Sequence, residues 1–292
     1  MKKRLLITGT SGFLGRHLCK LAATDFQILA AGRDPARQPR GTEPVLVDFL
    51  QPEQAANILE RCAFDAAVHA AAMAEPNICE KQPRDSQLVN VEATARIAEL
   101  CARRGVPMLS ISTDLVFDGT RAPYREDDPM APINTYGQHK AKAEESVLRA
   151  HSGNAVLRLP MLYGRPDYSE RNFLASLLQQ LAAGQRLRLF SDEIRTPVHA
   201  EDAARGILLA LKQGYAGRLH LGGTERVSRA EFGRTLTEVM GLGEDRIENM
   251  RQADWKMAAA RPADVSLDSS RAGGLGYAPR NVRQGITDAL AK

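Results

Sequence analysis

The sequence has no long hydrophobic run. Behind the basic start Met1–Arg4 stands only the apolar stretch Leu5–Ile7 before Gly9, which is too short for the apolar segment of a signal peptide. Nowhere does the chain approach the ~20 consecutive apolar residues of a membrane span. We therefore expect a soluble, cytoplasmic protein with no membrane partner.

Excess charge and cysteine are also scarce. The 39 basic and 35 acidic residues leave a formal net charge of +4, which is too small and dispersed to favour nucleic acid as a partner. The four cysteines show neither CxxC spacing nor a pattern with histidine, so we expect reduced thiols and no metal site. They are Cys19, Cys62, Cys79 and Cys101.

The chain does have size and a regular alternation of patterns. Its 292 residues, 43% of them hydrophobic, suit one large enzyme-like unit or two closely packed domains. Short apolar runs alternate with helical patterns as far as residue 160, which predicts an α/β fold with a doubly wound parallel sheet of the Rossmann type. The expected strands are 5–8, 27–31, 44–47, 65–70, 108–112 and 155–159, and the expected helices are 16–23, 52–61, 88–104 and 140–150.

Beyond residue 160 the pattern is less regular and predicts a smaller C-terminal substrate-binding lobe. We expect residues 1–160 to form the dinucleotide-binding domain, with 197–222 returning to it. Segments 161–196 and 223–292 are expected to form mainly the lobe. Helices are expected at 172–183, 201–212, 229–240 and 282–290, and strands at 186–190 and 218–221.

Gly9, Gly12 and Gly15 follow the first expected strand and open the first expected helix. Glycines at this spacing permit a tight turn and let the backbone approach a pyrophosphate, whose charge the N-terminus of the helix favours. Phe13 and Leu14 lie between the second and third glycine and are expected to border the cofactor with them.

The residues that follow the second expected strand bear on which nicotinamide cofactor binds. An acidic residue there would pair with the ribose 2′-hydroxyl. The chain instead has Gly32 and then Arg33, whose guanidinium would hold a 2′-phosphate. NADP, as NADPH, is therefore the expected cofactor, and Asp34 beside the arginine leaves NAD open.

Two further strand ends supply expected cofactor contacts. Asp48 closes the third strand and could accept a hydrogen bond from the adenine amino group, with Phe49 beside it. The fourth strand ends in Ala70, Ala71 and Ala72, whose small side chains suit a backbone that lies against a cofactor.

Tyr136 and Lys140 point to bond-making chemistry. A spacing of four places the phenol and the ammonium on one face of a helix. A nearby cation lowers the pKa of a phenol from its usual value of ~10 towards working pH. The spacing alone also occurs on solvated helices, but Ser112 and Thr113 end the fifth expected strand, where a hydroxyl could polarise a substrate carbonyl beside Tyr136.

A glycine-rich loop, a strand-end hydroxyl and Tyr-x-x-x-Lys in this order resemble the extended short-chain dehydrogenase/reductase family, and within it the dTDP-4-dehydrorhamnose reductase group. The resemblance covers nearly the whole chain. The assignment to this group depends more on two segments, Phe117-Asp118-Gly119 and Arg261-Pro262, than on the glycine-rich loop. The other matching segments are 69–72, 89–94, 112–116, 124–127, 132–137, 157–164 and 263–264.

The resemblance implies a role for each reaction residue. Thr113 would hydrogen-bond the substrate carbonyl oxygen, with Ser112 as the second candidate. Tyr136 would be the general acid that protonates this oxygen. Lys140 would lower the pKa of Tyr136 and bind the nicotinamide ribose.

The resemblance also implies binding residues outside these motifs. Asn90 would support a proton-relay water, although it could equally be an ordinary buried amide, and Pro160 would border the nicotinamide. Asn172 would bind the diphosphate of the substrate, and Arg261 is the first choice among the arginines expected in the cleft. The other arginines in that group are Arg165, Arg171, Arg186, Arg188 and Arg195.

Leu115 limits the reaction that the resemblance implies. The related 4,6-dehydratases have Thr-Asp-Glu, in which the glutamate abstracts a proton from the sugar, and Leu115 stands at the place of that glutamate. Elimination of water is therefore not expected. The reductase group commonly has an aromatic residue at this place, and Gly12–Gly15 looks more like the epimerase branch, so the sugar itself is left open.

Three functional hypotheses follow. The first is an NADPH-dependent reductase of a 4-keto nucleotide sugar. The second is a nucleotide-sugar epimerase, which would retain NAD and consume none. The third is a non-catalytic, NADP-binding regulatory subunit similar to the β subunit of methionine adenosyltransferase. Relatives often pair through the helices at 88–104 and 136–150, so a homodimer is also an open expectation.

Overall fold

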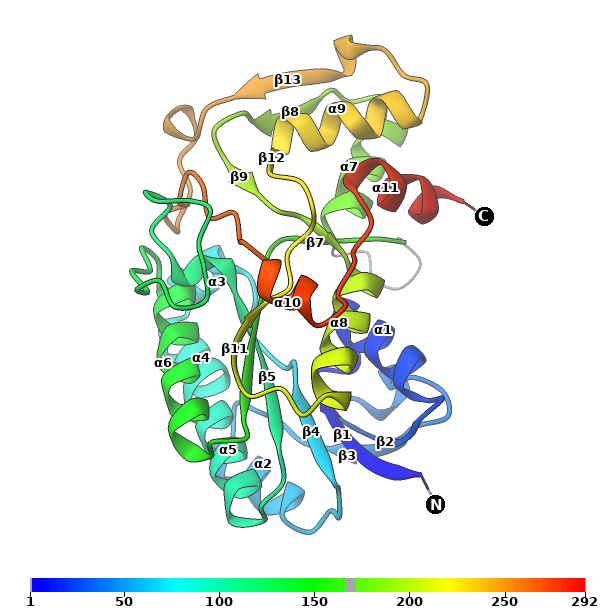
Figure 1. Ribbon diagram of the computed structural model, residues 1–292. Coiled ribbons are helices and arrows are strands. Elements are labelled where there is room, and N and C mark those ends of the chain that lie inside the picture. Colours follow the sequence, from blue (N-terminus) through cyan, green and yellow to red (C-terminus); the bar gives the residue numbers. More distant parts are fainter. Residues whose placement is uncertain (1, 166–171, 292) are drawn as a thin grey trace.

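A computed structural model describes residues 2–165 and 172–291 (Figure 1). Its centre is a seven-stranded sheet in the order β11-β6-β5-β4-β1-β2-β3, in which every neighbouring pair is parallel. This order confirms the predicted Rossmann-type sheet. The strands are β1 (Lys3–Thr8), β2 (Phe26–Gly32), β3 (Glu43–Leu46), β4 (Ala66–His69), β5 (Met108–Thr113), β6 (Ala155–Leu159) and β11 (Gly217–His220).

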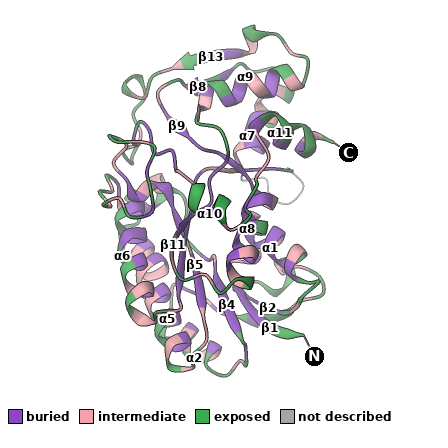
Figure 2. Ribbon diagram, in the orientation of Figure 1, coloured by how far each residue is buried: buried purple, intermediate pink, exposed green. Residues whose placement is uncertain are grey.

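The apolar side chains of these strands alternate between two cores, because successive strand residues face opposite sides of a sheet. Leu5 and Ile7 belong to one core, which the helices α1 (Phe13–Ala22) and α8 (Ala200–Lys212) cover. Leu6 belongs to the other core, which α2 (Pro52–Leu59), α5 (Ala93–Arg103) and α6 (Thr135–Ala150) cover. Figure 2 shows the buried strands between helices whose outer faces are exposed.

The helices on this side differ in one respect from the prediction. Two short helices, α3 (Pro76–Lys81) and α4 (Pro83–Gln87), precede the expected helix at 88–104. The first residues of that expected helix, Leu88–Glu92, form a π-helical turn. Within this turn the Asn90 side chain hydrogen-bonds the backbone of Met73, on the loop after β4. The widened turn therefore lies where the helix is tied to the carboxyl end of the sheet.

The C-terminal part has a third core around a small parallel pair of strands, β8 (Leu187–Phe190) and β13 (Ile247–Met250). The helices α7 (Phe173–Ala182), α9 (Arg229–Val239) and α11 (Val282–Leu290) pack on it, and Figure 1 shows this unit beyond the carboxyl edge of the large sheet. The predicted domain boundaries stay a prediction. The other strands and α-helix of the described residues are β7 (Leu162–Tyr163), β9 (Ile194–Arg195), β10 (Val198–His199), β12 (Val227–Ser228) and α10 (Ser270–Gly274).

Candidate active site

The glycine-rich loop is shaped by backbone contacts that exclude side chains. Gly9 has a φ of +72°, and a Cβ built on it would lie 2.7 Å from the amide nitrogen of Ala71. A Cβ on Gly15 would lie only 2.2 Å from the Gly9 carbonyl oxygen. Gly12 is the N-cap of α1 and has no side chain to fill the space before the helix. The open N-terminus of α1 thus remains accessible to an anion, as the fit of a pyrophosphate requires.

Replacing Gly15 by Ala is expected to weaken NADPH binding about tenfold or more, since the new methyl group would push the backbone of the loop out of place. Calorimetric titration with NADPH measures this change. Gly273→Ala in α10 is the matched control, because a Cβ there meets nothing within 4 Å. An unchanged affinity in Gly15→Ala would show that this loop does not hold the cofactor.

A buried chain of hydrogen bonds joins the ends of β1 and β4 beside the loop. Thr8 Oγ1 accepts from the backbone N–H groups of Ala70–Ala71 at 3.1 and 3.0 Å, so its own proton points to His69 Nδ1 at 2.8 Å. His69 Nε2 must then be the protonated nitrogen and donates to Thr94 Oγ1 at 3.0 Å. Burial, together with the charge of Lys140, lowers the pKa of His69 to about 3. A neutral His69 therefore orients the Thr8 hydroxyl, which in turn holds the Ala70–Ala71 backbone next to Gly9.

The residues of the glycine-rich loop and of the third strand that were expected to contact the cofactor differ in their exposure. Phe13 is partly exposed and its ring lies edge-on to His17 at 5.3 Å, whereas Leu14 is packed in the core. Phe49 is also a core residue, with its ring 5.8 Å from that of His69. Asp48 accepts a hydrogen bond from the amide of Leu50 at 3.0 Å. Leu14 and Phe49 are thus core residues in this structure, and their contact with a cofactor stays a prediction.

Basic residues gather at the end of β2. Arg33 is exposed directly after Gly32, and Arg16 on α1 reaches the same segment through a 3.2 Å hydrogen bond to the carbonyl oxygen of Arg37. The side chain of Asp34 accepts a hydrogen bond from the backbone amide of Ala36, two residues away, at 2.9 Å. Arg16 and Arg37 were not predicted from the sequence, because only the packing of α1 against this segment brings them near Arg33.

Asn90 and Pro160 are both buried. The Asn90 amide donates to the carbonyl oxygen of Met73 at 3.0 Å and to Ser86 Oγ at 3.1 Å, and its oxygen accepts from the amide of Met73 at 3.0 Å. In this arrangement the side chain anchors the loop that follows Ala72. Pro160 closes β6 at the carboxyl edge of the sheet.

Helix α6 brings Tyr136 to the end of β5. Asn134 caps the helix by accepting from the amide of Gly137 at 2.9 Å. A Cβ on Gly137 would lie 2.1 Å from the carbonyl oxygen of Leu115, so glycine is needed for this close approach of helix and strand end. Tyr136 is buried and shares a hydrogen bond with Thr113, the last residue of β5. The structure thus brings the two predicted reaction residues together.

Tyr136 holds its proton in this environment. Burial is the main cause, and the nearby Cys79 and Asp114 add to it, so that the pKa of Tyr136 is raised above its ordinary value despite the hydrogen bond with Thr113. A phenol that is fully protonated at neutral pH is the form that a general acid requires.

Lys140 lies one turn further along the buried face of α6. Its Nζ donates to the carbonyl oxygen of Ile111 at 2.5 Å. Burial lowers the pKa of Lys140 to about 8, and the carboxylate of Glu144 acts in the opposite direction. The ammonium is thus held against β5, and a lowering of the pKa of Tyr136 by Lys140 stays a prediction.

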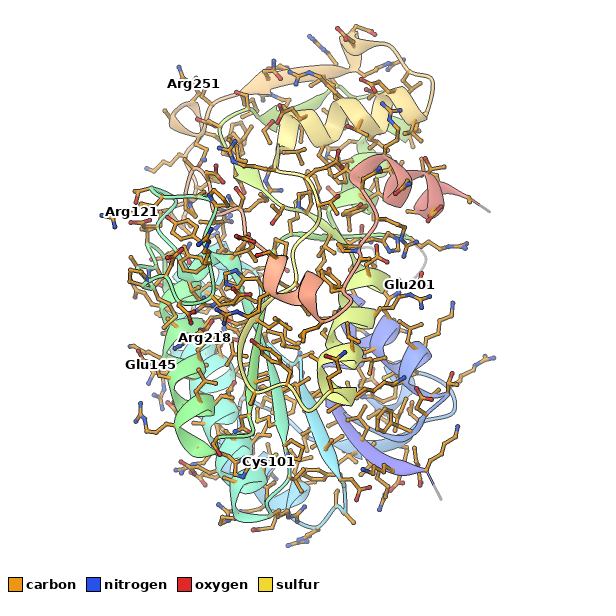
Figure 3. All side chains as sticks on the ribbon, viewed as in Figure 1. Cys101, Arg121, Glu145, Glu201, Arg218 and Arg251 are labelled. Carbon is orange, nitrogen blue, oxygen red and sulfur yellow. The ribbon has the colours of Figure 1, made fainter. Side chains whose placement is uncertain are left out.

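Ser112 is turned away from this pair. Its Oγ donates to Glu144 Oε1 at 2.6 Å. Arg158 also reaches Glu144, with Nη2 at 2.8 Å from Oε2, and both side chains are 1% exposed. Arg218, labelled in Figure 3, adds a contact at 3.3 Å. This network was not predicted from the sequence, although an arginine within the otherwise apolar strand Ala155–Leu159 is a signal for it.

A second buried group of charges faces Thr113 and Tyr136. Asp114 lies 3.3 Å from Arg195 Nε, and Glu193 contacts both Arg195 at 3.3 Å and Arg229 at 2.8 Å. Arg261 joins this group electrostatically, and its Nη1 is buried without a hydrogen-bond partner in residues 2–165 and 172–291. Burial lowers the pKa of Arg261. Three guanidiniums thus meet two carboxylates, which leaves one positive charge in excess.

The other predicted substrate residues lie differently. Asn172 is the N-cap of α7, and its Oδ1 accepts from the amide of Ala175 at 2.9 Å. Arg188 is paired with Glu248 at 3.2 Å on the outer face of β8, and Arg186 donates to the carbonyl oxygen of Asp245. Arg165 is exposed, and Arg171 lies outside the described residues. Among the arginines of this group that the structure describes, Arg195 and Arg261 reach the charged group beside Thr113.

The described part of the chain contains no group of three or more His, Cys, Asp or Glu side chains that could hold a metal ion. None of its helices is long and apolar enough to cross a membrane.

The chain is similar to several known proteins over nearly its whole length. The family profile described as "RmlD substrate binding domain" matches residues 2–292. Methionine adenosyltransferase 2 subunit beta of Pongo abelii is 30% identical, over 99% of this chain and 87% of the relative. The probable low-salt glycan biosynthesis reductase Agl14 of Haloferax volcanii is 32% identical, over 92% of this chain and 90% of the relative.

The fold is also similar to that of a solved enzyme. The crystal structure of a dTDP-4-dehydrorhamnose reductase from Bacillus anthracis in complex with NADP superimposes with a TM-score of 0.87. The two sequences are 24% identical, and the match covers 98% of each chain.

Proposed function

The chain belongs to the RmlD substrate binding domain family, the dTDP-4-dehydrorhamnose reductases of the extended short-chain dehydrogenase/reductase type, and from this membership we propose that it is an NADPH-dependent reductase of a 4-keto nucleotide sugar. The observation that carries the proposal is the meeting of Thr113, Tyr136 and Lys140 at the carboxyl edge of the sheet, beside the glycine-rich loop. A cytoplasmic location and a homodimer stay predictions.

The residues of this chain fit a nicotinamide dinucleotide. Gly9 and Gly15 leave no room for a Cβ, so the loop backbone at the N-terminus of α1 lies open to a pyrophosphate, with the Ala70–Ala72 backbone beside it. Arg33, with Arg16 and Arg37 nearby, supports binding of a 2′-phosphate and hence NADP over NAD. When bound, this cofactor supplies the hydride for the carbonyl carbon.

The proton comes from the protein in this proposal. Tyr136 donates its phenolic proton to the carbonyl oxygen of the substrate, while Thr113 hydrogen-bonds the same oxygen. Lys140 has a pKa of about 8, so its side chain is positively charged below this pH. This charge favours the phenolate that Tyr136 becomes. Arg261 and Asn172 are proposed to hold the diphosphate of the substrate, because the buried Nη1 of Arg261 can still donate a hydrogen bond.

A second candidate function rests on the relatives. The match to subunits named methionine adenosyltransferase 2 subunit beta extends over 99% of the chain. It supports a regulatory subunit that binds NADP and assembles with a larger enzyme. The meeting of Thr113, Tyr136 and Lys140 supports the reductase over this second candidate.

The test is to add NADPH or NADH to the purified protein with dTDP-4-dehydrorhamnose and other keto-sugar nucleotides, and to follow the cofactor absorbance. We expect net oxidation, with kcat/KM at least about tenfold higher for NADPH, which corresponds to roughly one 2′-phosphate ion pair. Tightly retained NAD without net consumption would instead identify an epimerase. Inactivity on every sugar, with co-purification of a methionine adenosyltransferase, would identify a regulatory subunit.

A further inference from the structure

Asp114 is a buried carboxyl next to the reaction residues to which the proposed mechanism gives no task. It is 3% exposed and its two oxygens have different neighbours. Oδ1 accepts the hydroxyl proton of Thr113 at 3.0 Å. Oδ2 lies 3.3 Å from Arg195 Nε, at an angle that leaves it without a hydrogen bond from the described residues.

The hydrogen bonds of Thr113 leave no proton for a substrate while Asp114 is ionised. Thr113 Oγ1 has one proton and two lone pairs. The proton points to Asp114, and one lone pair accepts from the amide of Leu115 at 3.2 Å. Because a carboxylate is a stronger acceptor than a neutral carbonyl, Thr113 cannot turn its proton to a substrate oxygen at low cost.

The charges around Asp114 allow either protonation state. Arg195 is shared with Glu193 and with the carbonyl oxygens of Ile194 and Pro262, so it compensates Asp114 only in part. Burial, with a smaller effect from Glu193, raises the pKa of Asp114 to about 6, although Arg195, Thr113 and Arg229 lower it. Tyr136 on α6 faces the same carboxyl.

We propose that Asp114 is a positioning residue whose protonation turns the Thr113 hydroxyl from the carboxylate towards the substrate carbonyl. This inference rests on the proposed reductase function. Arg195 has only N–H donors, so a proton on Asp114 must sit on Oδ1, the oxygen that faces Thr113. That O–H then donates to Thr113 Oγ1, and the threonine proton is released to polarise the carbonyl beside Tyr136. No covalent bond changes in this step apart from the protonation of Asp114.

The single-turnover rate of NADPH oxidation with dTDP-4-dehydrorhamnose tests this as a function of pH. The wild-type rate should rise roughly twentyfold when the pH falls from about 7.5 to about 5.5, because neutral Asp114 increases by that factor for a pKa of about 6. In Asp114→Asn the side-chain oxygen should face Arg195 and the NH₂ group Thr113, which mimics the protonated state. This variant should change less than about twofold over the same range and exceed the wild type at pH 7.5.

Arg229→Gln supplies a second variant that leaves Asp114 and Thr113 in place. Arg229 is 27% exposed and lowers the pKa of Asp114, so its removal should shift the pH dependence to higher pH. A merely structural role of Asp114 predicts neither this shift nor a faster Asp114→Asn variant. If Asp114→Asn is slower than the wild type at pH 7.5, or keeps the wild-type pH dependence, the inference is wrong.

Infrared difference spectra separate this inference from the reductase function. The wild type without substrate should gain a carboxylic acid C=O band as the pH falls through about 6. The band should be missing in Asp114→Asn and shifted in Thr113→Val, which cannot accept the Asp114 proton. An inactive wild type that shows this band would contradict only the proposed function. A wild type without the band, active or not, would overturn the role of Asp114.

Discussion

Tyr136→Phe is expected to lower kcat for reduction of the keto sugar by about 10²–10⁴-fold, the usual contribution of a general acid. The substitution removes only the phenolic oxygen. The ring still fills the buried position at the start of α6, and the Asn134 cap and the contact of Gly137 with Leu115 do not depend on the hydroxyl. KM for NADPH should therefore stay close to the wild-type value. Steady-state NADPH oxidation measures both constants.

Tyr277→Phe is the matched control. Tyr277 is also buried, at 8% exposure, and its hydroxyl makes no hydrogen bond within the described part of the chain. Loss of an oxygen without a partner costs little, so kcat should stay within about twofold of the wild type. Full activity in Tyr136→Phe would remove Tyr136 from the mechanism and with it the main support for a reductase of this type.

Glu144→Leu is expected to lower the free energy of unfolding by about 3–5 kcal/mol, because it leaves the buried charge of Arg158 without its main partner. Arg158 is fully buried. Its Nε and Nη2 donate to the carboxylate of Glu144 at 2.8–3.2 Å. In the variant the guanidinium would retain its hydrogen bond from Nη1 to the carbonyl oxygen of Glu126 and its position over the Phe117 ring, 4.9 Å from the ring centre. Urea denaturation followed by circular dichroism measures the change.

Two variants check the cause of this loss. Glu145→Leu alters the exposed neighbour on the same helix, labelled in Figure 3, and should change the stability by less than about 0.5 kcal/mol. In the double variant Glu144→Leu/Arg158→Met an apolar pair replaces the ion pair, so most of the stability should return. Equal stability of Glu144→Leu and the wild type would show that the ion pair is not needed for folding.

The secondary structure near the sheet could be predicted because its signals are local. Consecutive residues carry the signal of an apolar run such as Ala155–Leu159 and of a helical pattern such as 201–212. The bounds of both elements lie within one or two residues of the prediction. The short helix α3 and the paired strands β9 and β12 were missed. Two-residue strands depend on a partner from elsewhere in the chain, and their own residues carry no periodic signal.

The site was predictable to the extent that its residues follow strand ends or keep helical spacing. Gly9, Thr113, Tyr136 and Lys140 meet at one edge because parallel strands end together there. Ser112 has the same local signal as Thr113, yet its hydroxyl is bound by Glu144. A one-residue difference along a strand reverses the face, and which face meets the site depends on the helix packed above it.

By itself, the sequence determined the parallel sheet, the glycine-rich loop after β1 and the membership of the chain in a reductase family. Only the tertiary structure decided which charges reach Thr113. Asn134 binds the carbonyl oxygen of Ala260, 126 positions away, and so carries Arg261 to the start of α6. Arg186 and Arg188 have the same chemistry, but Arg186 precedes β8 and donates to the carbonyl oxygen of Asp245, and Arg188 pairs with Glu248 on the outer face of β8. Sequence spacing fixes neighbours within one helix or strand, whereas contacts between distant segments follow from the packing of whole elements.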